Sequence, residues 1–166
     1  YASEIVTLGD VADFYLKRDR MKPSPSDIAQ HFANALPHCK ELNMRMDLLE
    51  DARAIMSMPY DKRLIGDPET GVIHGGAVSA LMDSCGGASV FMHPENASAS
   101  VTLDLRIDYM RPATPGERIS AESHCFHVTR NVAFVRVTAW AGDNKDQPVA
   151  TATGAFSFIH KTKGRV

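Results

Sequence analysis

The sequence has few of the features that mark membrane, secreted or nucleic-acid-binding proteins. No apolar run approaches the roughly 18–20 residues of a membrane span, and the first residues lack the charged-then-apolar order of a signal peptide. The only cysteines, Cys39, Cys85 and Cys125, are odd in number and widely spaced, which fits a reducing compartment better than a disulfide framework. Eighteen Lys and Arg nearly balance 20 Asp and Glu, so charge favours neither nucleic acid nor a membrane surface. We therefore expect a cytoplasmic protein with a small-molecule partner.

The composition is that of one globular domain. The chain has 166 residues, of which 44% are hydrophobic and 23% charged, enough for a single core. Residues 1–40 are predicted to form an N-terminal helical extension. Its second helix would be capped at Ser26 or Asp27, would carry apolar residues at helical spacing from Ile28, and would end at Pro37. Residues 41–166 then form the main domain.

The main domain reads as an α+β fold. Alternating apolar residues predict a hairpin of strands over 42–47 and 52–58, and four further strands over 101–107, 119–128, 133–141 and 149–159. Between them an apolar helix is predicted over residues 75–88, with Gly86 and Gly87 in its interior. Interior glycines weaken a helix, so we expect both to mark close packing. Turn residues between the last four strands predict an antiparallel meander, and the sheet must wrap around the helix to bury it.

The start of this helix is the best candidate for chemistry. His74-Gly75-Gly76 opens the helix, and Asp83 follows nine residues after the histidine. A helix N-terminus presents unpaired N–H groups and partial positive charge, so it can polarise a carbonyl. A carboxylate on an apolar stretch needs a cleft or a polar partner. Asp83 is therefore either a catalytic base or a carboxylate satisfied by its neighbours, and the glycines are either site or tight-turn residues.

A wider pattern contains these residues in a fixed order. It consists of Gly71-x-x-His74-Gly75-Gly76, then Asp83, the strand end Tyr109-Met110-Arg111-Pro112-Ala113, and a last strand over 149–158. Over about residues 42–159 this pattern resembles the hotdog-fold acyl-CoA thioesterases of the phenylacetate-pathway (PaaI-like) family. The resemblance implies a hotdog fold, in which an antiparallel sheet wraps a long central helix, and hydrolysis of an acyl-CoA.

The resemblance also implies roles for the motif residues. The backbone N–H of Gly75 would form the oxyanion hole, His74 would orient that loop, and Gly76 would contact the substrate. Asp83 would act as general base or nucleophile, supplied by the opposite subunit of a homodimer or of a dimer of dimers. The acyl-CoA is the substrate, and no further cofactor and no metal is implied.

Some positions depart from the family pattern and leave alternatives open. Asp67 stands where many relatives have Asn, so it either caps the turn or enters the site, and the turn role is favoured. Thr102 replaces a Ser that orients water in some relatives, and is otherwise an ordinary strand residue. Arg111 and Arg130 are candidates for binding the CoA phosphates, although exposed turn arginines are commonly only solvated, and Asn131 is a candidate substrate contact.

Other interpretations are weaker. His124, Cys125 and His127 look like metal ligands, but neighbouring strand residues point to opposite faces, so no metal site is predicted. A hotdog hydratase would need a His-based motif rich in Phe and Pro that is absent. A non-catalytic acyl-CoA or ligand-binding protein remains the main alternative, because a fold alone does not fix a function. A partner-binding subunit using residues 1–40 is a third.

Overall fold

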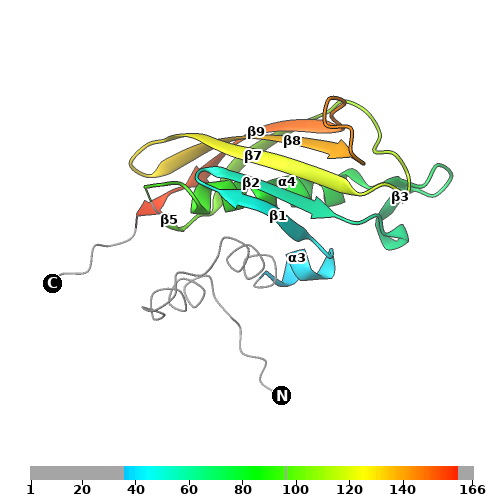
Figure 1. Ribbon diagram of the computed structural model, residues 1–166, viewed down its shortest axis with the longest axis horizontal. Helices are drawn as coiled ribbons and strands as arrows, with labels where there is room; N and C mark the ends of the chain where they lie inside the picture. Colours follow the sequence, from blue (N-terminus) through cyan, green and yellow to red (C-terminus); the bar gives the residue numbers. More distant parts are fainter. Residues whose placement is uncertain (1–35, 96, 161–166) are drawn as a thin grey trace, which may run out of the picture.

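The computed structural model describes residues 36–95 and 97–160, in which one antiparallel sheet curves around a single long helix, α4 (Figure 1). The six strands lie in the order β1-β2-β7-β8-β9-β6, and all neighbours are antiparallel. Their bounds are Arg45–Glu50 (β1), Arg53–Met58 (β2), Thr102–Tyr109 (β6), Ile119–Val128 (β7), Val132–Ala141 (β8) and Ala150–Ser157 (β9). The predicted α+β wrapping of a sheet around a helix is therefore confirmed.

Several short elements were not predicted from the sequence. Two small antiparallel pairs join β3 (Ile65–Asp67) to β4 (Val72–Ile73), and β5 (Ala97–Ala99) to β10 (Ile159–His160). A 3-10 turn, η1, spans Lys62–Leu64. The β3–β4 pair encloses the turn that leads into α4, so it fixes where that helix begins.

Helix α4 (Gly75–Phe91) fills the concave side of the sheet and runs lengthwise along it (Figure 1). Its buried residues recur every three or four positions, which places them on one face: Val78, Leu81, Met82, Cys85, Ala88 and Ser89. Gly86 lies on this face, where an added Cβ would sit 2.9 Å from the Phe156 ring, so the predicted close packing is confirmed there. At Gly87 the prediction is wrong, because an added Cβ would find only ordinary contacts from 3.8 Å.

The order of the strands corrects the predicted meander. Strands β7, β8 and β9 do follow one another, but β6 pairs with β9 at the edge of the sheet instead of with β7, and the hairpin of β1 and β2 pairs with β7. One edge of β6 therefore has no partner among the described residues. Apolar side chains on and beside β6 are also exposed, with Val101 at 63% and Leu103 at 59%.

The N-terminal extension is described only from residue 36. Pro37 begins the short helix α3 (Pro37–Glu41), which was not predicted, at its first position, where a missing N–H costs nothing. The helix predicted over residues 28–36 lies almost entirely outside the described residues. Within α3, Cys39 is buried against the main domain. No helix in the described part of the chain is long and apolar enough to cross a membrane.

Candidate active site

The first turn of α4 is held in place by His74, the residue before it. His74 is the N-cap residue, and its Nδ1 accepts a hydrogen bond of 2.9 Å from the N–H of Gly76. The N–H of His74 in turn donates to the carbonyl oxygen of Leu64 at 2.8 Å. Upstream, Gly71 adopts a left-handed φ of 76°, and its carbonyl accepts from the Tyr60 hydroxyl at 2.8 Å. The contacts of His74 agree with its predicted role of orienting this loop.

The N–H of Gly75 is the free donor of this turn. It has no acceptor among the described residues, as is usual for the first N–H of a helix. Gly75 is half-buried and lines a pocket of about 400 Å³. The remaining lining is largely apolar: Val72, Ile73, Val78, Tyr109, Met110, Arg111, Pro112, Ala113 and Val149. A donor at a positive helix end beside an apolar pocket can hold a carbonyl oxygen.

Gly76 has a structural task in the same turn. Its N–H is already taken by His74, so it is not available as a donor to a substrate. A Cβ at this position would lie 2.9 Å from Nδ1 of His74, so the cap requires glycine here. The predicted contact of Gly76 with substrate therefore remains a prediction without support from its N–H group.

Asp83 meets Thr102 at the start of strand β6. The Thr102 hydroxyl donates to Oδ1 of Asp83 at 2.8 Å, and the Asp83 residue is half-buried. At the next residue of α4, the Ser84 hydroxyl accepts a hydrogen bond of 3.5 Å from the thiol of Cys39. Burial raises the pKa of Cys39, the bond to Ser84 lowers it, and the nearby charge of Asp83 raises it further. Asp83 and Thr102, which the sequence analysis named separately, therefore contact each other in the structure.

Asp67 lies in the turn between β3 and β4. Its carboxylate accepts from the Thr70 hydroxyl at 2.6 Å and from the N–H of Glu69 at 3.1 Å. These bonds, the Thr70 bond first, hold the pKa of Asp67 below its usual range. The residue is exposed, and both carboxylate oxygens are engaged within the turn. The contacts favour the turn role over entry into the site.

The predicted phosphate-binding residues occupy two distant places. Arg111 follows β6 and donates from Nη2 and Nε to the carbonyl oxygen of Gln147, at 2.7 and 3.2 Å. Arg130 and Asn131 lie in the exposed turn between β7 and β8. The carbonyl of Asn131 accepts from the N–H of Phe158, near the end of α4 that is opposite Gly75.

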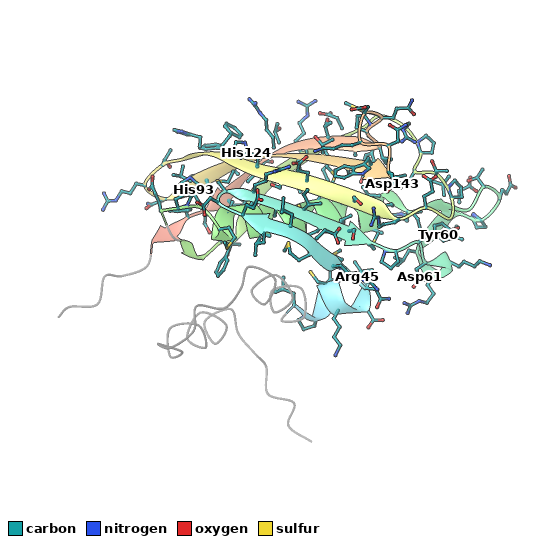
Figure 2. All side chains as sticks on the ribbon, in the orientation of Figure 1. Arg45, Tyr60, Asp61, His93, His124 and Asp143 are labelled. Atoms are coloured by element: carbon teal, nitrogen blue, oxygen red, sulfur yellow. The ribbon has the colours of Figure 1, made fainter. Side chains whose placement is uncertain are left out.

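The predicted site residues therefore form two groups within one chain. The first, at the start of α4, contains Asp67, His74, Gly75, Gly76 and Arg111, and the second contains Asp83, Thr102, Arg130 and Asn131. Figure 2 shows the two ends of the molecule, with Tyr60 near one end and His93 near the other. Gly75 and Asp83 are eight residues apart on one helix, which at 1.5 Å per residue is about 12 Å. One carbonyl group cannot touch both of them.

The histidine and cysteine side chains of β7 do not all share one environment. Cys125 is buried and His124 is exposed, which is the predicted alternation across a strand, and the His127 ring stacks on Phe134. In the described ranges, no three His, Cys, Asp or Glu side chains are grouped in a way that could hold a metal ion.

Two residues of the site were missed from the sequence. The hydroxyl groups of Tyr109 and Ser79 both contact the carbonyl oxygen of Gly75, at 2.7 and 3.1 Å. Tyr109 stood in the quoted strand-end motif, but nothing in its position indicated a contact 34 residues back along the chain.

Comparison with known proteins agrees with this architecture. Residues 70–147, which include both Gly75 and Asp83, match the model of the thioesterase superfamily. A crystal structure of a Pseudomonas aeruginosa protein is 38% identical, with a TM-score of 0.71 over 81% of this chain and 98% of that one. A mutant of the phenylacetic acid degradation protein PaaI from Thermus thermophilus is 25% identical, with a TM-score of 0.65 over 75% of this chain and 100% of that one.

Fold and site together define an enzyme of the hotdog type. The chain belongs to the thioesterase superfamily, and the resemblance to PaaI-like proteins is confirmed. Among curated relatives, the medium/long-chain acyl-CoA thioesterase YigI of Escherichia coli K12 is 26% identical over 143 residues, 78% of this chain and 90% of that protein.

Proposed function

We propose that this protein hydrolyses acyl-CoA thioesters to free CoA and a carboxylic acid. The observation that carries the proposal is the unpaired N–H of Gly75, at the start of α4, beside an apolar pocket of about 400 Å³. The thioesterase superfamily and the acyl-CoA thioesterase activity of the relative YigI support the same reaction. The acyl-CoA is the substrate, and the proposed chemistry draws on no other cofactor.

The N–H of Gly75 serves as the oxyanion donor. It donates to the thioester carbonyl oxygen, whose negative charge grows as the carbonyl carbon becomes tetrahedral. The partial positive charge of the helix N-terminus acts in the same direction. Removing one such oriented donor typically costs about 10²- to 10³-fold in turnover.

Asp83 serves as the base, or alternatively as the nucleophile. As base, it takes a proton from a water molecule while the water oxygen bonds to the thioester carbon. The C–S bond then breaks, the acid is released, and the proton passes to the CoA thiolate. The Thr102 hydroxyl, bonded to Oδ1 of Asp83, orients the carboxylate and leaves Oδ2 for the water. General-base assistance of this kind contributes on the order of 10²- to 10⁴-fold.

The complete site needs two copies of the chain. Gly75 and Asp83 lie about 12 Å apart along one helix, which is too far for both to act on one carbonyl. We assign Gly75 of one copy and Asp83 of a second copy to each active site. A two-fold dimer would then contain two identical sites.

Strand β6 is the surface we assign to this dimer. Its outer edge is unpaired among the described residues, and Leu103, Tyr109 and Met110 are each at least half exposed. An exposed apolar sheet edge is a natural template for a second strand. If two copies of β6 pair antiparallel, the Thr102 end of one lies beside the Tyr109 end of the other. That arrangement brings the two groups of site residues together, including Arg111 of one copy and Arg130 and Asn131 of the other as candidate contacts for CoA.

Hydrolysis is tested by measuring CoA release. Short-, medium- and long-chain and arylacetyl thioesters are offered to the wild type and to Asp83→Asn, with Asp143→Asn as the matched control. Asp143 is 99% exposed and lies in the β8–β9 turn, far from Asp83. We expect kcat to fall at least about 100-fold in Asp83→Asn and to stay within about twofold in Asp143→Asn. Binding of acyl-CoA by the wild type with no turnover of any thioester would establish a binding protein instead.

The shared site is tested by mixing two inactive variants. Gly75→Pro removes the donor N–H at the first helical position, and the φ and ψ of His74 (−59° and 133°) are those tolerated before proline. Its new Cβ would lie 3.2 Å from Tyr109 and would displace that ring, so folding and self-association of this variant are checked before mixing. Refolded together in equal amounts, Gly75→Pro and Asp83→Asn should form half mixed dimers, each with one intact site. About a quarter of wild-type activity should return. If both variants are inactive alone and the mixture stays inactive, the site is not shared.

A further inference from the structure

The carbonyl group of Gly75 is held by a tyrosine from the edge strand. Tyr109, the last residue of β6, donates its hydroxyl to the Gly75 carbonyl oxygen at 2.7 Å. The same hydroxyl lies 2.7 Å from Oγ of Ser79, which itself lies 3.1 Å from that carbonyl oxygen. The hydroxyl groups of Tyr109 and Ser79 thus contact the Gly75 carbonyl oxygen and each other. The start of α4 is tied in this way to the end of the unpaired sheet edge.

These contacts hold both ends of a single peptide unit. The carbonyl of the Gly75–Gly76 peptide is fixed by Tyr109 and Ser79, and its N–H by Nδ1 of His74 at 2.9 Å. Glycine has the widest choice of backbone angles, so two successive glycines would otherwise leave this turn loosely defined. Fixing the peptide that follows Gly75 restricts the ψ angle of Gly75. Together with the His74 cap, it also restricts the direction of the Gly75 N–H group.

The tyrosine ring also lies directly on Gly75. A Cβ at Gly75 would sit 3.2 Å from both Cζ and Oη of Tyr109, tighter than ordinary contact. The ring can therefore reach the carbonyl only because position 75 has no side chain. Tyr109 also lines the pocket that Gly75 lines, although its hydroxyl is already engaged on the carbonyl.

We infer that Tyr109 is a positioning residue for the oxyanion donor. It touches neither the thioester nor the attacking water. Its hydroxyl keeps the Gly75 N–H aimed at the place where the oxyanion forms, and Ser79 supports that hydroxyl. The inference rests on the proposed thioesterase function. Because the effect acts on an interaction made mainly in the transition state, it should be visible in kcat more than in KM.

The test compares two Tyr→Phe substitutions that remove the same kind of bond. Tyr109→Phe deletes the hydroxyl over Gly75 but keeps the ring. Tyr60→Phe is the matched control, because the Tyr60 hydroxyl donates to another glycine carbonyl, that of Gly71, at 2.8 Å outside the helix. Steady-state kinetics with the best acyl-CoA substrate, melting temperature and oligomeric state are measured for the full-length variants and the wild type.

We expect Tyr109→Phe to lower kcat about 5- to 20-fold with KM within about twofold, and Tyr60→Phe to leave both parameters within about twofold. The double variant Ser79→Ala/Tyr109→Phe should fall further than Tyr109→Phe alone, since the second hydroxyl is then lost. Unchanged kcat in Tyr109→Phe would overturn the inference, as would a loss that merely follows a lower melting temperature or a dissociated oligomer. An inactive wild type would instead overturn the proposed function, so the two failures are distinguishable.

Discussion

The contact between Gly86 and Phe156 leads to opposite predictions for two neighbouring glycines. Replacing either glycine by alanine in the middle of α4 should gain about 1 kcal/mol from helix propensity. At Gly86 the new Cβ would lie 2.9 Å from Cζ and 3.2 Å from Cε2 of Phe156. Phe156 is 2% exposed and sits on β9 between β6 and β8, so its ring has little room to move. Overpacking of this kind costs about 1–3 kcal/mol.

The cost therefore exceeds the gain at Gly86 and not at Gly87. We expect Gly86→Ala to lower the free energy of unfolding by up to about 2 kcal/mol. At Gly87 the new Cβ meets Cε1 of Phe156 at 3.8 Å and Oγ of Ser100 at 4.0 Å, which are ordinary contacts. Gly87→Ala should therefore raise the free energy of unfolding by about 0.5–1 kcal/mol.

The two variants are compared by urea denaturation, with unfolding monitored by far-ultraviolet circular dichroism. Protein concentration is kept the same throughout, because self-association adds to apparent stability. The slope of the unfolding free energy against urea should not change, so the midpoint reports stability directly. A Gly86→Ala protein as stable as Gly87→Ala would refute the reasoning.

Two further predictions concern the thiols and a partly buried carboxylate. Burial raises the pKa of Cys85 to about 12 and of Cys125 to about 11. At pH 8 the thiols of the native protein should therefore react slowly with a thiol reagent, and those of the denatured protein should react fully. Rapid reaction of any thiol in the native protein would contradict this. Desolvation raises the pKa of Glu122, but Lys145 and Arg53 together lower it below 4.5. The interactions of Glu122 with Lys145 and Arg53 therefore stabilise the native protein above pH 4.5, and this stabilisation is lost as pH falls through the lowered pKa. Glu122→Gln should therefore lower the free energy of unfolding at pH 7 by about 0.5–1 kcal/mol, and by less near pH 3; equal losses would disprove it.

The elements that were predictable are those with a local signal. Helix α4 follows from the His74-Gly75-Gly76 start and its apolar spacing, and the strands from alternation, because period and turn residues are properties of nearby positions. Pro37 shows the limit of such signals, since proline fits the first turn of a helix as well as the residue after one.

Strand order could not be obtained in the same way. Apolar and polar residues do alternate along β6. This alternation predicts that one face of the strand is buried, but it does not show which element buries it. Pairing with β9 leaves Leu103 exposed in the single chain, and that outcome depends on a strand, Ala150–Ser157, that lies far along the sequence.

The candidate site was predictable in its residues and not in its grouping. Asp83 and Thr102 were each named from the family pattern, and the hydrogen bond that joins them spans 19 residues across two elements. The contact of Tyr109 with Gly75 depends on where the end of an edge strand meets the start of a helix, which no local pattern encodes.

The uninterrupted course of α4 has a consequence for how such a protein can change over evolution. If each copy supplies Gly75 to one active site and Asp83 to the other, the separation of the two catalytic centres is set by a count of residues. Inserting or deleting one residue between positions 75 and 83 would turn Asp83 by about 100° and shift it by about 1.5 Å. Both centres would be lost in one event, so the length of this interval is fixed.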